Sequence, residues 1–251
     1  MQARLAWARA GLTFAALAAA TSIAAAGSVA GKLELPPGGL ALPALGRAFL
    51  PRIENPLAPV RGVDPLPSMV VVLQPGPGVE LPPPPAATVT WELRGDSFAR
   101  PLMVARLGST IELRNSGFNA PFLVAFGQPD LFEKKPINPS DRPQLKPTQG
   151  GLIDIIDQST PYLRGRALVV DRGLFAIPDG TGKFVFDDVP AGSWTVRVFY
   201  APPNTAMRNP GRPGATPTPA GWIDRTDEVV AVGAKRTELT VKLPAGLPVK
   251  P

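Results

Sequence analysis

Two residue types that this chain lacks limit the chemistry open to it. Its 251 residues include no cysteine and no histidine. Without a thiolate or an imidazole, the sequence excludes disulfides, cysteine-type zinc sites, Ser–His–Asp triads and facial-triad iron sites. Carboxylates, lysine, tyrosine, serine and threonine are the groups left for catalysis. We therefore expect a protein that is not an enzyme and that holds no metal or other cofactor.

The carboxylates that come closest to a reactive pair are Asp154 and Asp157, with Asp141 preceding them. They lie in the segment GLIDIID, residues 151–157, which is apolar enough to be a strand. Side chains alternate along a strand, so residues 154 and 157 are expected on opposite faces, which counts against acid–base work. A calcium ion needs about six to eight oxygen ligands, and no EF-hand spacing surrounds these residues. A carboxylate-based enzyme remains the less favoured alternative.

The elements that must position such residues are predicted to be strands. Thirty-three prolines and 25 glycines separate short apolar and β-branched runs, a pattern typical of an all-β protein. On the apolar faces of two such runs lie Trp91 and Trp194, which we expect in the core. Trp222 follows a proline- and glycine-rich loop and is the candidate for an exposed ligand contact, although packing in the core or at an edge is favoured for it as well. The predicted strands cover residues 29–35, 69–73, 88–93, 101–106, 110–114, 151–157, 166–170, 173–177, 183–186, 193–200, 229–232 and 237–243.

The N-terminus has the pattern of a secretory signal. Arg4 and Arg9 precede an alanine-rich apolar stretch that ends in small residues. We expect residues 1–26 to be a signal peptide, cleaved after Ala26 or Ala30. No second apolar segment of about 20 residues follows, so no membrane span is expected after signal removal. The predicted location is periplasmic or secreted.

Charge and proline content give two further expectations. The net charge of +6 comes from dispersed basic residues without interleaved aromatics, which argues against nucleic acid as a partner. Three proline-rich loops, at residues 36–67, 75–85 and 201–221, lack periodic apolar residues. Little burial would offset the entropy of ordering them, so the sequence predicts that they are mobile.

The C-terminal third resembles a carboxypeptidase regulatory-like β-sandwich. The segment FAIPDGTGKFVFDDVPAGSWTVRVFY, residues 175–200, has that family's D-x-x-G and V-P-x-G turns between strands. The family also opens with an alternating strand and an apolar one, which match residues 28–35 and 69–73. The resemblance implies one sandwich built from residues 28–73 and 174–243.

Residues 88–170, between these halves, are similar to cupredoxin domains of the plastocyanin-like, methylamine-utilisation-associated kind. The matching features are Phe98 and Pro101, which resemble the family's F-x-P run with one more residue between them, a later glycine, and the Asn-Ser-Gly sequence that starts at Asn115. The resemblance implies an inserted Greek-key sandwich. In that family, a histidine loop and a C-x-x-H-P-x-M loop supply the copper ligands at one end.

Carried over onto this chain, the copper positions fall on residues that cannot bind copper as the family does. The first histidine position falls near Pro121, and Asp157, Thr160 and Leu163 occupy the Cys, His and Met positions. Blue-copper centres need two imidazoles and a thiolate, so the implied electron transfer does not carry over. If the resemblance holds, the four residues converge on one end of the sandwich. Phe118, Phe122 and Phe126 nearby are interpreted as an apolar cluster that fills the vacated space.

The sequence therefore predicts an all-β protein of two sandwich units, with a copper-less cupredoxin-like domain at residues 88–170 inserted into a regulatory-like sandwich. The expected function is that of a non-catalytic exported binding or accessory module of bacterial type. Its ligand would be a protein partner or a glycan. The alternatives are a structural spacer and, less favoured, a carboxylate-based enzyme.

Overall fold

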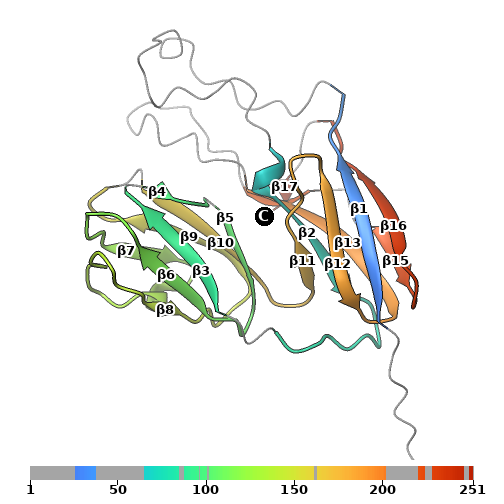
Figure 1. Cartoon of the computed structure of the whole chain (residues 1–251), viewed down its shortest axis with the longest axis horizontal. Coiled ribbons are helices and arrows are strands. Elements are labelled where there is room, and N and C mark those ends of the chain that lie inside the picture. Colours follow the sequence, from blue (N-terminus) through green and yellow to red (C-terminus); the bar gives the residue numbers. More distant parts are fainter. Residues whose placement is uncertain are drawn as a thin grey trace, which may run out of the picture.

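The computed structural model describes residues 26–37, 65–84, 88–95, 97–100, 102–160, 163–201, 220–223, 228–245 and 249–250. Residues 1–25 of the predicted signal peptide and most of the proline-rich segments 36–67 and 201–221 lie outside them, and so do the expectations about their cleavage and mobility. In the described part the chain forms two β-sandwiches that lie beside each other (Figure 1). The predicted all-β class is confirmed.

Residues from both ends of the chain form the first sandwich. One of its sheets, sheet A, has the order β12-β1-β16. The facing sheet, sheet B, has the order β11-β2-β13-β14-β17, and β15 also pairs with β13. The bounds of these strands are β1 Gly27–Glu34, β2 Met69–Pro75, β11 Leu174–Ala176, β12 Lys183–Val189, β13 Gly192–Tyr200, β14 Gly221–Ile223, β15 Glu228–Val232, β16 Thr237–Lys242 and β17 Val249–Lys250, with a short 3₁₀ turn at Leu66–Ser68.

The core of this sandwich joins strands that are far apart in sequence. Val29 and Leu33 of β1 pack in one apolar cluster with Trp194 and Val196 of β13. Trp194 is fully buried, and its indole Nε1–H donates to the carbonyl of Pro190 at 2.9 Å. The apolar face of sheet A packs only against the facing side of sheet B. The N-terminal strand and the C-terminal third therefore cover each other's apolar side chains.

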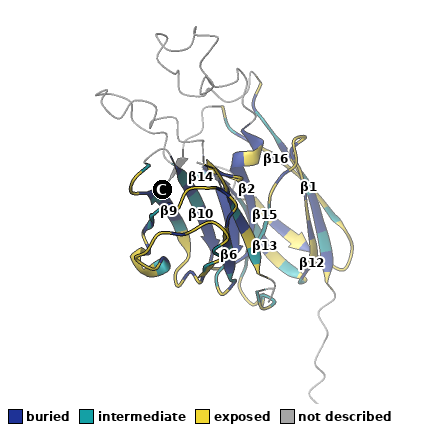
Figure 2. Cartoon of the chain, turned by 60° about the vertical axis from the view of Figure 1, so that its left-hand side comes forward, coloured by how far each residue is buried: buried dark blue, intermediate teal, exposed yellow. Residues whose placement is uncertain are grey.

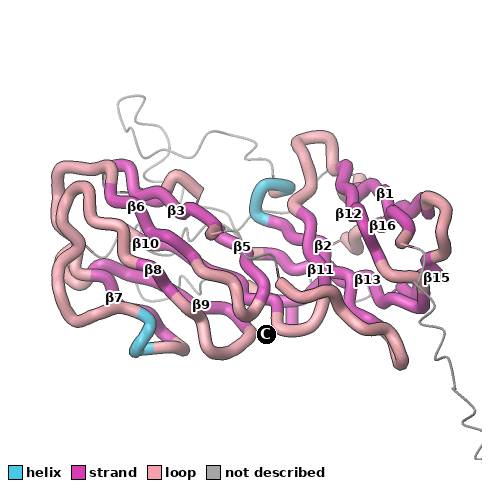
Figure 3. The backbone as a smooth tube through the Cα atoms, turned by 60° about the horizontal axis from the view of Figure 1, so that its bottom comes forward, coloured by secondary structure: helices cyan, strands magenta, loops and turns pink. Residues whose placement is uncertain are grey.

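The second sandwich is formed by residues 89–170. Sheet C has the order β4-β3-β6-β8, and sheet D has the order β5-β10-β9-β7. Helical structure in the described residues is confined to two 3₁₀ turns, the one before β2 and one at Pro129–Leu131 (Figure 3). The strand bounds are β3 Val89–Arg94, β4 Ser97–Phe98, β5 Leu102–Arg106, β6 Ile111–Asn115, β7 Leu123–Phe126, β8 Gln144–Leu145, β9 Gly151–Asp157 and β10 Arg164–Val170.

Trp91 lies in the core of the second sandwich, as its place on an alternating strand predicts. Its ring stacks on Phe98 at 4.3 Å between centroids, and its Nε1–H donates to the Arg100 carbonyl at 2.8 Å. Gly165 on β10 passes directly under both rings, and a Cβ there would lie 2.6 Å from Trp91. A glycine is therefore required at this position by close packing.

A third apolar cluster joins the two sandwiches. Val70 and Val72 of β2, on the face opposite the first core, contact a layer made by β5 and β10 of the second sandwich. The clustered buried residues are Val70, Val72, Leu102, Val104, Leu168, Val170, Phe199 and Ala201. The strands β2 and β13 of the first sandwich and β10 of the second are buried over most of their length, as the dark blue colour in Figure 2 shows. The order of sheets is therefore C, D, B and A, with D and B packed against each other.

The connection between β2 and β3 is held at several points. Val79 and Leu81 pack against the first core. Arg106, at the end of β5, donates from Nη2 to the Pro82 carbonyl at 2.7 Å and from Nη1 to the Pro83 carbonyl at 3.3 Å. The expectation of a mobile segment at residues 75–85 does not fit these contacts, because its isolated apolar side chains and its carbonyls both find partners.

The described strands include every strand that the sequence predicts, most with ends displaced by one or two residues. The strands that were not predicted are β4, β7, β8, β14 and β17, which span two to four residues each. Such segments are too short to show a period of two. No helix among the described residues is long and apolar enough to cross a membrane.

Replacement of Val72 by aspartate tests the contact between the sandwiches. Val72 is 1% exposed in this contact, so Val72→Asp would bury an unpaired carboxylate. We expect a loss of about 3–5 kcal/mol of unfolding free energy, measured by urea denaturation. Val185→Asp is the matched control, because Val185 is 49% exposed on the outer face of β12. Equal losses in the two variants would contradict the buried contact.

Candidate functional site

Asn115, the last residue of β6, ties together the loops at one end of the second sandwich. The side chain is 2% exposed. Its Nδ2 donates to the carbonyls of Asn119 and Ile137, both at 2.8 Å, and its Oδ1 accepts from the Gly117 amide at 2.9 Å. One buried amide group therefore fixes residues 116–119 against the loop that follows β7. From the sequence, Asn115 was expected to matter only through a family resemblance, although Asn-Ser-Gly directly after a strand is a turn signal.

Pro121 and Asp157 lie at the same end of the sandwich. Pro121 is buried, and its carbonyl accepts from the Ile137 amide at 3.0 Å. The next residue, Phe122, donates its amide to Asp157 Oδ1 at 2.7 Å. Asp157 is the last residue of β9 and is 3% exposed, opposite Leu123 in the β7–β9 ladder. The Asp157 carboxylate thus bonds a backbone amide from the loop that contains Pro121.

The two remaining positions of the predicted set follow Asp157 in one short loop. Leu163 donates its amide to the Thr160 carbonyl at 2.8 Å, and its own carbonyl accepts from the Asp157 amide at 3.1 Å. Leu163 is buried in the second core, whereas Thr160 is half-buried. Residues 161 and 162, including the retained proline, lie outside the described residues. Pro121, Asp157, Thr160 and Leu163 are therefore brought together at one end, which we call the loop end: residues 115–122, 157–160 and 163, together with Ile137.

The loop end has the chemistry of a closed structural site. Its one buried carboxylate bonds an amide, its leucine packs in the core, and its asparagine bonds three backbone groups. Within the part of the chain that the structure describes, no cluster of three or more carboxylate, histidine or cysteine side chains could hold a metal ion. These residues can hold the loops in fixed positions, so that the exposed side chains of the loops are displayed to solvent in a fixed arrangement.

Asp154 and Asp157 are separated by the strand that carries both. Asp157 points into the sandwich, whereas Asp154 lies on the outer face of β9, where its Oδ1 pairs with Arg166 Nε at 3.0 Å. Asp141 forms its own local turn, in which Oδ2 accepts from the Asn138 amide at 2.8 Å. The three carboxylates do not share a site.

The phenylalanines do not form the predicted cluster. Phe118 is 98% exposed, and Phe126 is 58% exposed. Leu123 and Ala125 of β7 supply the core side chains, so the alternation of this strand turns residues 124 and 126 outward. Phe118 lies in Ser-Gly-Phe-Asn, a polar turn sequence, and this is the signal that could have placed it at the surface.

Trp222 is packed, as the favoured interpretation of the sequence has it, and is not an exposed ligand contact. It is half-buried on β14, beside the contact between the two sandwiches. Its ring meets Phe199 edge-on at 5.2 Å between centroids, and the Arg197 guanidinium carbon lies 4.4 Å from the ring centroid. Pairing of β14 with β13 places Trp222 directly opposite Phe199. With these neighbours Trp222 does not form an open platform.

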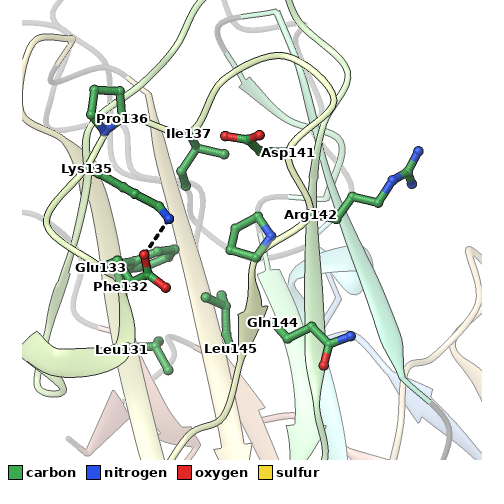
Figure 4. A pocket seen from close by; sticks show the side chains of 11 residues that line it. Leu131, Phe132, Glu133, Lys135, Pro136, Ile137, Asp141, Arg142, Gln144 and Leu145 are labelled. Carbon is green, nitrogen blue, oxygen red and sulfur yellow. Dashed lines mark ion pairs between the residues drawn. The ribbon is translucent and has the colours of Figure 1, made fainter.

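A pocket of about 310 Å³ lies next to the loop end, in the chain between β7 and β8 (Figure 4). Its floor is apolar, with Phe132, Ile137 and Leu145 all buried. Its rim carries the ion pair between Glu133 and Lys135, and the Glu133 carboxylate raises the pKa of the lysine. Ile137 belongs to both the pocket and the Asn115 network, so the two features share one framework.

Comparison with known proteins gives a limited result. No family model matches the chain, and no curated protein matches it. Among solved structures it is similar to a purple cupredoxin from Nitrosopumilus maritimus, with 14% identity over 32% of this chain and 98% of that one, and a TM-score of 0.30. It is also similar to amicyanin from Paracoccus versutus, with 20% identity over 34% and 83% of the two chains, and a TM-score of 0.30. At such scores these likenesses remain resemblances of β fold.

Asn115→Ala tests how far the loop end depends on one side chain. The substitution leaves two carbonyls and one buried amide without their partner, so we expect a loss of about 2–4 kcal/mol of unfolding free energy. Asn138→Ala is the control, because Asn138 is exposed and bonds only within its own turn. Urea denaturation measures both. A loss below about 0.5 kcal/mol for Asn115→Ala would show that the network contributes little.

Proposed function

We propose that this protein is a non-catalytic, exported binding module that docks a protein partner at the loop end of its second sandwich. Phe118 is the anchor residue in this proposal. The single observation that carries it is the exposure of this ring, 98%, on a turn that a buried asparagine holds in place.

A rigid turn lowers the cost of using Phe118 as an anchor. The entropy lost when surface loops become ordered normally opposes binding, and loops that are already ordered avoid much of that cost. The Gly117 amide is fixed by Asn115, and the Ser116 hydroxyl donates to Glu92 at 2.8 Å. Aromatic side chains that enter a partner's pocket are typical of the residues that contribute most to protein–protein affinity. An exposed phenyl ring on a braced turn has both properties.

A protein partner fits these observations better than a glycan does. Sugar rings stack on open aromatic platforms, and the candidate for such a platform, Trp222, is covered by Phe199 and Arg197. The pocket beside the loop end offers an apolar floor with one ion pair at its rim, which suits an apolar side chain of a partner. The separate environments of Asp154 and Asp157 give no support to a carboxylate-based enzyme.

The location is also part of the proposal. A periplasmic or secreted protein is supported by the signal-like N-terminus. The partner would then be an exported or surface protein.

Truncation of the anchor should separate binding from stability. Phe118→Ala removes a side chain that packs against no core, so unfolding free energy should change by less than about 0.5 kcal/mol. The affinity for the partner should fall at least about tenfold. Phe126→Ala is the matched control, because Phe126 is an exposed phenylalanine on the same sandwich. An affinity that falls equally in both variants would contradict the role of Phe118.

The partner can be found by site-specific cross-linking in the native host. A photoreactive phenylalanine analogue at position 118 should give one defined adduct in the exported fraction, whereas the same analogue at position 126 should not. Mass spectrometry identifies the adduct, and binding is then measured with the purified pair. Absence of any adduct at position 118, or the same adducts at both positions, would overturn the proposal.

A further inference from the structure

Within the described residues, the outer edge of β16 has backbone groups without a partner at three alternate residues. Sheet A ends with β16, which is hydrogen-bonded on one side, to β1. The Leu243 amide donates to the Glu34 carbonyl of β1, so odd-numbered residues in this stretch direct their backbone groups toward β1. The backbone groups of Glu238, Thr240 and Lys242 therefore point outward, to the free edge. All three residues are exposed.

The side chains along this edge are self-complementary about Thr240. The sequence Glu-Leu-Thr-Val-Lys, residues 238–242, has an acid and a base at equal distances from its central threonine. Leu239 and Val241, which face the first core, are likewise equidistant from it. Among the described residues neither Glu238 nor Lys242 forms an ion pair within the chain.

We propose that two copies of this chain associate through β16, antiparallel, about a two-fold axis at Thr240. Glu238 of each copy then lies opposite the partner's Lys242, and the two Thr240 residues lie opposite each other. Each of the three residue pairs exchanges both of its backbone hydrogen bonds, because these are the residues whose groups point outward. Opposite charges and paired threonines are favourable neighbours across strands. The result is a continuous six-stranded sheet from two copies of sheet A.

Other arrangements of the same edge lack this complementarity. A parallel pairing in register would set Glu238 against Glu238 and Lys242 against Lys242. An antiparallel shift by two residues in one direction would set Lys242 opposite Thr240 and Glu238 opposite Pro244, which has no amide hydrogen. The shift in the other direction would set Lys242 opposite Arg236, a pair of like charges. Exposed edge strands commonly carry charges that prevent unwanted pairing. Here the charges prevent the other registers and favour one.

The opposite edge of sheet A, formed by β12, is occupied at its start and interrupted near its end, so β16 offers the longer regular edge of this sheet. At the start of β12, Lys183 donates its amide to Asp179 Oδ1 at 2.9 Å and accepts at its carbonyl from the Asp179 amide at 2.9 Å. The same carboxylate accepts from the Thr181 hydroxyl, and this bond lowers the pKa of Asp179. Further along β12, Asp188 has a positive φ of 54°, which interrupts the edge.

A charge-reversal experiment on the purified full chain tests this dimer. Sedimentation velocity over a concentration series should show reversible dimerisation, with a dissociation constant of roughly 10–100 µM, because the interface is small. Glu238→Lys creates two like-charge pairs and should weaken association by about 10- to 100-fold. The double variant Glu238→Lys, Lys242→Glu restores the opposite charges and should return to within about threefold of the original.

A backbone variant gives an independent test. Thr240→Pro removes an amide hydrogen that faces outward and not β1, so sheet A should keep its hydrogen bonds while the dimer is lost. Thr240→Val keeps the amide and is the matched control. Circular dichroism and urea denaturation confirm that each variant is folded.

The outcomes are distinct. A chain that remains monomeric to about 1 mM, or a dimer unaffected by both Glu238→Lys and Thr240→Pro, overturns the proposal. Loss of association in Glu238→Lys with recovery in the double variant supports it. None of these results depends on Phe118 or its partner, so the dimer and the proposed docking function can fail separately.

Discussion

The arrangement of this protein depends on sheet B having two apolar faces. On one face, Val71 and Leu73 of β2 pack in the first core, and on the other, Val70 and Val72 pack against the second sandwich. A strand that is buried on both sides must be apolar throughout, which is why residues 69–73 contain no polar residue. Exposure of either face would leave an apolar surface in water, so each sandwich stabilises the other.

This double burial also explains how a long insertion is tolerated. Residues 89–170 leave the first sandwich after β2 and return at β11, which pairs with β2. The insertion therefore begins and ends beside the same strand, and its own outer layer, β5 and β10, packs back on that strand's outer face. Arg106 adds a polar contact by donating to two carbonyls of the outgoing connection. The two units are held at their junction by both apolar packing and hydrogen bonds.

Much of the fold follows from sequence patterns, whereas the surface of the candidate site does not. Alternation places Trp91 and Trp194 in the cores, and the turn residue Gly182 has the positive φ, 83°, that its place after Asp179 suggests. The convergence of Pro121 with Asp157 was expected from a resemblance and not from periodicity. Phe118 was assigned the wrong environment, and for Trp222 two environments were left open, because a single aromatic residue in a loop carries no period. The burial of such an aromatic residue depends on which strand packs next to it. The strands concerned, β7 and β14, were both too short to predict.

The two proposed contacts use opposite ends of the stack of sheets. Sheet A, with β16 at its edge, is the layer farthest from the second sandwich, while Phe118 follows β6 in sheet C, the outermost layer at the other end (Figure 1). Because D and B are packed against each other between them, a dimer through β16 would leave both loop ends uncovered. Each dimer would then present two Phe118 anchors joined by rigid β-sandwiches instead of flexible linkers. Such a bivalent arrangement raises effective affinity for a repeated or clustered partner, provided that the spacing of the partner's sites matches that of the two loop ends.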